Sequence, residues 1–271
     1  MAAGRHQLLS DVMSRHMQVL WRSALMVALC LSLPSLSFGQ VKVLMSGGFL
    51  AAYQELVPQF EKATGITITT LRGPSQGKGP DTIGAQLRRG VKADLVIMNR
   101  EGLEELLSDG RVVAGTEVDL ARVLLGLAVR HGAAKPRIDT VAAFKHALRS
   151  AKSISSDSSA RVYIITKMLP QLGVADSVLP KLANGGASAV ADGGSDFVIL
   201  PVSELLQAEG VDYVGAIPAE IQHVSVFSAV LVTGSQRRES ARRLIDFLTS
   251  EAASTAIRKS GMQPARLREK E

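Results

Sequence analysis

Three short stretches of the sequence combine serine and glycine in the same pattern. Each follows a run of β-branched and apolar residues and precedes a helical segment: Ser46-Gly47-Gly48, Ser75-Gln76-Gly77 and residues 155–159. At the start of a helix, free backbone N–H groups and the helix dipole favour an anion. Glycine lets the backbone approach closely, and serine adds hydroxyl donors. The pattern therefore predicts a site for a small oxyanion held by neutral donors.

The same serines also have a structural interpretation, as helix caps and turn residues. Asp157, inside the third stretch, suits an anion site poorly because a carboxylate repels an anion. We therefore expect Asp157 to cap its helix or bond another loop, and to point away from a ligand. Arg72 and Lys78 flank the second stretch, and we expect Arg72 to face solvent. Tyr163 lies one turn into a predicted helix and is a candidate for either the core or the cleft.

The segments that would position these stretches alternate between strand and helix. Apolar and β-branched runs predict strands at residues 41–45, 66–71, 93–98, 122–129, 197–200, 211–214 and 223–233. Amphipathic spacing and capping residues predict helices at 49–64, 81–89, 102–108, 160–172, 202–209 and 239–250, with Asp81 as the N-cap of the second. This order predicts an α/β fold whose mostly parallel sheet is covered on both faces. In such sheets a ligand lies beyond the carboxyl ends of the strands, where the serine stretches are.

The alternation restarts after the middle of the chain, which predicts two α/β units. Two long strands, at about 122–130 and 223–233, would link them. The single cysteine, Cys30, lies near the N-terminus, so no disulfide is expected and the protein must rely on its core.

Residues 1–39 have the layout of a secretory signal peptide. Three arginines form a basic start, an apolar run follows at 24–33, and small residues precede Gln40. The apolar run is too short to span a bilayer comfortably, because a spanning helix needs roughly 20 apolar residues. We therefore predict export to the periplasm with cleavage near Gly39 and Gln40. The alternative is an uncleaved membrane anchor.

The sequence lacks the motifs that are typical of several classes of enzyme and metal site. Residues 73–78 resemble a phosphate loop, but too few residues separate the glycines and Gly79 replaces the Ser or Thr that would bind magnesium. No Gly-x-Ser-x-Gly elbow or dinucleotide fingerprint occurs, and the histidines beyond the leader, His131, His146 and His223, lack metal-ligand spacing. The net charge of +6 is spread along the chain, with few aromatic residues, unlike in nucleic-acid binders. We therefore predict that the protein is not an enzyme, needs no cofactor or metal, and binds no nucleic acid.

Taken together, the segments resemble the periplasmic molybdate-binding protein family of ABC importers. The resemblance rests on Val-Leu-Met-Ser-Gly-Gly-Phe at 43–49, a helix ending at 60–65, the loop at 73–78 and the strand at 93–97. A returning strand at 226–231 and the helix after it also fit. The family has the type II periplasmic-binding fold, in which two α/β lobes joined by two crossing strands hold molybdate or tungstate. The resemblance implies that fold for this chain.

The resemblance also implies a division of the chain. Residues 1–39 would be the signal peptide, 40–121 with 226–271 the first lobe, and 122–225 the second lobe. In the family, serine hydroxyls and backbone amides hold the oxyanion.

Carried over position by position, the family pattern matches this sequence in part. Its serine in the second loop falls on Ser75, whereas its serine in the first loop falls on Gly48, where Ser46 would substitute. Its tyrosine after the later strand falls near Leu200 and Pro201, where there is no phenol. The predicted ligand-binding residues are Ser46, Gly47, Gly48, Ser75, Gln76, Ser156, Ser158, Ser159, Tyr163 and Pro201.

These observations predict an extracytoplasmic solute-binding protein of an ABC importer. It would be a monomer that binds a molybdate- or tungstate-like oxyanion between two lobes and docks on a membrane permease. One alternative is a binding protein for another small anion such as a carboxylate. Others are an exported α/β hydrolase that uses Ser156 or Ser158, and a ligand-free relative that signals through a partner.

Overall fold

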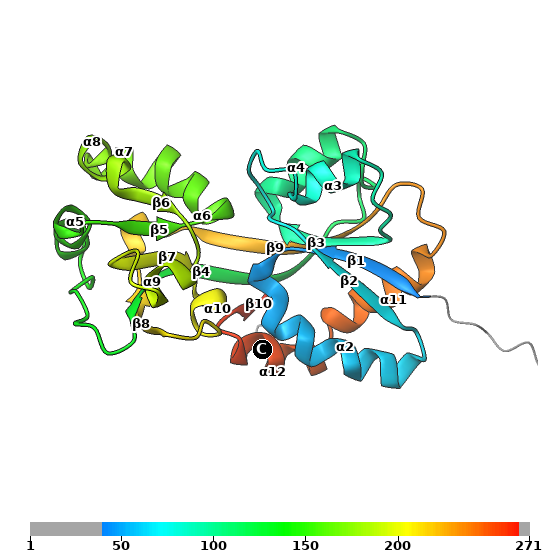
Figure 1. Cartoon of the computed structure of the whole chain (residues 1–271). Helices are drawn as coiled ribbons and strands as arrows, with labels where there is room; N and C mark the ends of the chain where they lie inside the picture. Colours follow the sequence, from blue (N-terminus) through cyan, green and yellow to red (C-terminus); the bar gives the residue numbers. More distant parts are fainter. Residues whose placement is uncertain (1–39, 266–271) are drawn as a thin grey trace, which may run out of the picture. The chain divides into compact units, whose positions relative to one another are not determined.

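The computed structural model describes residues 40–265, except for the side chains of Ser158 and Ser159 (Figure 1). The predicted signal peptide at residues 1–39 lies outside this part of the chain. Within residues 40–265 there is no helix long and apolar enough to cross a membrane.

The described strands form one hydrogen-bonded network in the order β2-β1-β3-β9-β4-β7-β5-β6, with β8 and β10 also paired to β4. The pairs β1–β2, β1–β3, β5–β6 and β5–β7 are parallel, as the alternation of strand and helix predicts. The strand bounds are β1 Val41–Met45, β2 Ile68–Arg72, β3 Leu95–Asn99, β4 Val118–Arg130, β5 Ile154–Ser156, β6 Leu182–Asn184, β7 Phe197–Pro201, β8 Val211–Ala216, β9 Val224–Leu231 and β10 Gln263–Pro264.

Two long antiparallel strands, β4 and β9, connect the two parts of this network. The first half of β4 pairs with β9, and its second half pairs with β7 and β8. β9 in turn pairs with β3, so it extends the sheet that contains β1 and β2. Figure 1 shows β4 and β9 running side by side between these two groups of strands. They are the two linking strands that the sequence predicts.

The helices cover the faces of the strands. The bounds are α2 Leu50–Thr64, α3 Ile83–Arg88, α4 Arg100–Ser108, α5 Val141–Ser150, α6 Ser158–Tyr163, α7 Leu169–Leu172, α8 Ala175–Val178, α9 Ser188–Ala191, α10 Val202–Leu205, α11 Arg238–Leu248 and α12 Glu251–Lys259. Short turns complete the list: η1 Gly47–Phe49, η2 Ile164–Met168, η3 Leu179–Lys181 and η4 Ala219–Ile221. The helix predicted at 160–172 is α6, the π-helical η2 and α7 in direct succession.

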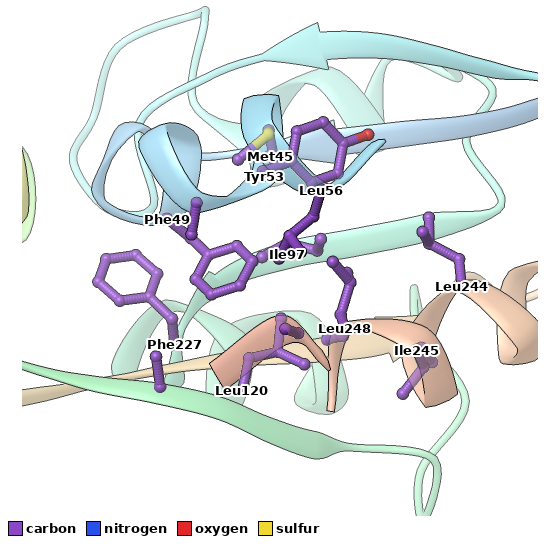
Figure 2. Close-up of a cluster of buried hydrophobic side chains, with 14 of the residues drawn as sticks. Met45, Phe49, Tyr53, Leu56, Ile97, Leu120, Phe227, Leu244, Ile245 and Leu248 are labelled. Atoms are coloured by element: carbon purple, nitrogen blue, oxygen red, sulfur yellow. The ribbon is translucent and has the colours of Figure 1, made fainter. Parts of the chain in front are cut away.

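Three hydrophobic clusters make the core. One cluster packs α2, α11 and α12 against β1, β3 and β9, with Phe49, Leu56, Ile97 and Leu248 completely or almost completely buried (Figure 2). A second lies under α3 and α4 on the opposite face of the same strands. The third joins β5 and β7 to the helices between residues 138 and 221. Apolar residues on both faces of β1 and β3 explain why these strands read as continuous apolar runs.

Two local predictions need correction. Thr82, rather than Asp81, caps α3, because its hydroxyl accepts a hydrogen bond from the Ala85 N–H at 3.3 Å. The helix predicted at 202–209 is the single turn of α10. Gly210, which has a left-handed φ of 74°, follows shortly after and leads into β8.

Candidate functional site

A cavity of about 420 Å³ opens where several strands end. β1 leads into Ser46, β2 ends at Arg72, and β5 leads into Asp157, so these residues lie beyond carboxyl ends of parallel strands. This is the position that the α/β arrangement predicts for a ligand. The cavity is lined by Ser46, Gly47, Gly48, Arg72, Gly73, Pro74, Ser75, Asp81, Asp157, Glu204 and Phe227.

Two serine hydroxyls in this cavity have a proton to offer. Ser46 is 5 % exposed, and its Oγ is buried without a hydrogen-bond partner among the described residues. Ser75 is equally buried, and its Oγ accepts a hydrogen bond from the Asn99 N–H at 3.2 Å. Because that bond uses a lone pair, the Ser75 hydroxyl hydrogen remains free to donate. A buried hydroxyl without a partner is costly unless a ligand or water completes it, so Ser46 in particular points to a bound acceptor.

The first loop carries a glycine at 48 because an aromatic ring fills the space where a side chain would begin. A Cβ on Gly48 would lie 2.1 Å from Cζ of Phe227, which is nearly fully buried in β9. The Gly48 carbonyl is held by the Ser203 hydroxyl at 2.7 Å. The cavity therefore has an aromatic wall at this position, where the family pattern would place a serine hydroxyl.

Four charged side chains border the cavity. Arg72 and Asp81 are exposed, and Asp157 and Glu204 are half-buried. A Cβ placed on Gly47 would lie 3.5 Å from Oε1 of Glu204 and 3.7 Å from a terminal nitrogen of Arg72, so the two groups converge at this glycine. Among the described side chains, none of these four makes a direct ion pair or hydrogen bond. Their charges are thus available to a ligand.

Glu204 is set up to exchange a proton near neutral pH. Burial raises the pKa of Glu204, the negative charge of Asp157 raises it further, and Arg72 opposes both, giving a pKa of about 7. Burial also raises the pKa of Asp157. A carboxyl group with a pKa near the working pH is well matched to general acid–base chemistry.

The predicted site residues fall into two groups. Ser46, Gly47, Gly48 and Ser75 line the cavity. Gln76 does not border it, and its Oε1 accepts a hydrogen bond from Asn99 Nδ2 at 3.4 Å.

Of the predicted residues further along the chain, Ser156, Tyr163 and Pro201 do not line the cavity. Ser156 is buried in β5, and its Oγ donates to the Ile199 carbonyl at 2.8 Å. The Tyr163 hydroxyl donates to the Ile221 carbonyl at 3.0 Å, and its ring stacks on His223. Pro201 ends β7 opposite Leu125. Ser158 and Ser159 have no described side chains.

Seven residues of the cavity wall were not proposed as ligand contacts from the sequence: Arg72, Gly73, Pro74, Asp81, Asp157, Glu204 and Phe227. Asp157 occupies the N-cap position of α6 but makes no capping hydrogen bond, and it borders the cavity instead of pointing away. Arg72 is exposed, as expected, yet it also borders the cavity. No pattern in the sequence was used to propose Glu204 or Phe227 as a ligand contact. The signal for Glu204 was present, since it is an acidic residue three positions beyond the end of a fully buried strand.

The fold is that of the type II periplasmic-binding class. A model of the family described as bacterial extracellular solute-binding protein matches residues 41–263, and the chain belongs to that family. The structure superposes on the periplasmic molybdate-binding protein of Azotobacter vinelandii with a TM-score of 0.66 and 22 % identity, covering 82 % of this chain and 98 % of the other. The predicted fold and the resemblance to molybdate-binding proteins are confirmed.

Two relatives of this chain carry different names, one as an isomerase and the other as a molybdate-binding protein. An aconitate isomerase of Pseudomonas sp is 36 % identical over 227 residues, which cover 82 % of this chain and 87 % of the relative. The molybdate-binding protein ModA of Azotobacter vinelandii is 25 % identical over 237 residues, covering 82 % and 89 %. The prediction that the protein is not an enzyme is contradicted, because a relative at 36 % identity over most of the chain is named as an isomerase.

Proposed function

We propose that the protein is an isomerase of a small unsaturated polycarboxylate of the aconitate type, with Glu204 as the group that moves the proton. The observation that carries the proposal is the Glu204 carboxyl group, which borders the cavity without a direct hydrogen-bond or ion-pair partner among the described residues and has a pKa of about 7. The relative named aconitate isomerase supports the choice of substrate class. The proposal refines the sequence-based alternative of a small carboxylate as ligand.

The chemistry needed is a proton shift along three carbons. In aconitate a CH2 group lies next to a carbon–carbon double bond that bears carboxylates, so its C–H bond is acidified. The Glu204 carboxylate takes this proton, and the electron pair of the broken C–H bond spreads over the three carbons and their carboxylates. The proton then returns to the far carbon, and the double bond forms anew between the other two. One C–H bond breaks and one forms, so no further reagent is consumed.

Part of the remaining wall offers contacts for an organic polyanion, although Asp81 and Asp157 add two carboxyl groups to it. Arg72 offers a positive charge to one carboxylate, and the Ser46 and Ser75 hydroxyls offer donors to others. These groups would also stabilise the negative charge that develops when the C–H bond breaks. Phe227 supplies an apolar surface for the carbon chain, a contact that an inorganic oxyanion does not need.

The test is an isomerisation assay by proton NMR, with cis- and trans-aconitate as the starting compounds. We expect the wild-type protein to interconvert them and Glu204→Gln to lower kcat by at least about 100-fold, the scale of general-base catalysis. Glu204→Gln keeps the size of the side chain and should still bind trans-aconitate in calorimetry. Ser156→Ala serves as the control, because the Ser156 hydroxyl is bonded within the fold and does not border the cavity.

Two results would contradict the proposal. The first is a wild-type protein that binds trans-aconitate without converting it at any pH from about 6 to 8. The second is full activity in Glu204→Gln, which would assign the proton transfer to another group.

Family membership supports a second role that is compatible with the first. Solute-binding proteins of this family imply a small ligand and a membrane transporter as partner. The accompanying proposals are export to the periplasm after cleavage near Gln40, a monomeric state, and docking on the permease of an ABC importer. The lobes would be 40–121 with 226–271 and 122–225, hinged on β4 and β9. Transport of the bound acid in cells that lack the gene would test this role.

A further inference from the structure

A second cavity, of about 380 Å³, adjoins the candidate site. It shares three lining residues with the first cavity: Gly47, Arg72 and Glu204. The Glu204 carboxyl group therefore stands in a wall that two separate spaces have in common. The proton transfer proposed above uses only the first space and leaves the second without a role.

The second cavity has the properties of a water passage. Its rim includes Gln54 and Gln207, whose side chains are exposed to solvent, and its inner wall includes Ala51 and Ala208, which are small and half-buried. A water molecule needs only about 10–15 Å³ of such space, so the cavity holds several. The polar rim and the small inner residues together leave an open path from solvent to Glu204.

Gly47 is what leaves the carboxyl group accessible at the shared wall. A Cβ on Gly47 would rest 3.5 Å from Oε1 of Glu204, in van der Waals contact with that oxygen. Any longer side chain at this position would cover the carboxyl group. The glycine keeps one oxygen of Glu204 uncovered where the two spaces meet.

We infer that Glu204 exchanges its proton with solvent through this second cavity while a substrate fills the first. The inference rests on the proposed function. A substrate bound against Arg72, Ser46 and Ser75 displaces water from the first cavity, so the second supplies the remaining contact between Glu204 and bulk water. In D₂O, a proton taken from the substrate onto Glu204 would be replaced by a deuteron before its return. The product would then carry deuterium at the carbon that receives it.

The first test measures access to position 204 and does not depend on catalysis. In the full chain with Cys30→Ser and Glu204→Cys, the new thiol is the only one and is labelled with a small methanethiosulfonate reagent. With saturating trans-aconitate filling the first cavity, we expect Ala51→Leu and Ala208→Leu, each of which narrows the second cavity, to slow labelling about tenfold, because access would then require a local opening. Ala63→Leu makes the same change at an exposed position of α2 and should leave the rate unchanged.

The second test measures deuterium incorporation per turnover when trans-aconitate is converted in D₂O. Ala51→Leu and Ala208→Leu, without the cysteine changes, should lower this ratio several-fold and alter kcat much less, whereas Ala63→Leu should alter neither. Unchanged labelling in both leucine variants overturns the inference, even if the protein has no isomerase activity. Slowed labelling in a protein that does not isomerise aconitate would instead support the passage and refute the proposed function. Slowed labelling with unchanged deuterium incorporation would mean that solvent exchange uses the first cavity, and it would also overturn the inference.

Discussion

At the scale of single residues, Glu204 combines a functional advantage with an energetic cost. The carboxyl group lies in a cavity near Asp157 and has no direct ion-pair partner among the described residues, so its charged form is disfavoured in the folded protein. Groups that an active site needs for its chemistry often lower the stability of the fold. Removing the charge should therefore abolish the proposed activity and stabilise the fold.

This cost predicts a pH-dependent effect of Glu204→Gln. The pKa of Glu204 is about 7 in the folded protein against the ordinary 4.5, so the folded state holds more protons between these values. Stability from this group is therefore present below pH 4.5 and lost as the pH rises through 7. Glutamine carries no charge at any pH, so the variant should be more stable than wild type at about pH 8, by up to about 3 kcal/mol.

Urea denaturation at several pH values measures this difference. At about pH 4.5 the two proteins should have similar free energies of unfolding, because Glu204 is then largely protonated when folded. A stability difference that is constant with pH would show that Glu204 does not titrate between these values.

At the scale of elements, Asn99 joins the second loop to a helix. It ends β3 and caps α4, where its Oδ1 accepts from the Gly102 N–H at 3.2 Å. Its Nδ2 donates to Gln76, and its backbone N–H donates to the Ser75 hydroxyl. One residue thus ends a strand, starts a helix and holds the loop that carries a proposed ligand donor.

We expect Asn99→Ala to weaken both the fold and the site. Loss of the cap should lower the free energy of unfolding by about 1 kcal/mol, and a looser 73–77 loop should weaken binding of trans-aconitate. Thr140→Ala is the matched control, because Thr140 caps α5 by accepting from the Ala143 N–H at 3.1 Å and does not border the cavity. It should lose similar stability without loss of affinity. Equal affinities in the two variants, measured by calorimetry, would refute the link between Asn99 and the site.

At the scale of the whole molecule, the cavity gathers residues that are far apart in the sequence. Its lining runs from Ser46 to Phe227 and includes the ends of β1, β2 and β5. A ligand in this cavity touches several elements at once and should stabilise the folded state as a unit.

Thermal unfolding with candidate ligands tests the ligand class. At about 100 times its dissociation constant, trans-aconitate should stabilise the protein by about 2.7 kcal/mol. Molybdate and tungstate should give smaller shifts at equal concentration, because Phe227 occupies the space next to Gly48. Arg72→Gln should reduce the trans-aconitate shift. A large shift with molybdate and none with trans-aconitate would return the ligand assignment to an inorganic oxyanion.

The sequence by itself was sufficient for the α/β class, the order of most elements and the two linking strands. These follow from local signals: apolar runs for the buried strands, amphipathic spacing for helices such as α2 and α11, and Gly65 just past the end of α2. The loops after β1 and β2 were also recognisable, because a serine–glycine stretch directly after a strand is a local pattern. That pattern identified four residues that do border the cavity: Ser46, Gly47, Gly48 and Ser75.

Only the tertiary structure shows which other side chains meet those loops. Phe227 lies beside Gly48 because β9 pairs with β3 in the register that sets Phe227 opposite Asn99. Glu204 reaches Gly47 because β7 pairs with β4 and delivers α10 to the cavity. No local pattern encodes a strand register between segments that lie this far apart in the sequence. The sequence alone therefore indicated an anion site with neutral donors, and the packing of β7 and β9 added the Glu204 carboxyl group and the aromatic wall of Phe227.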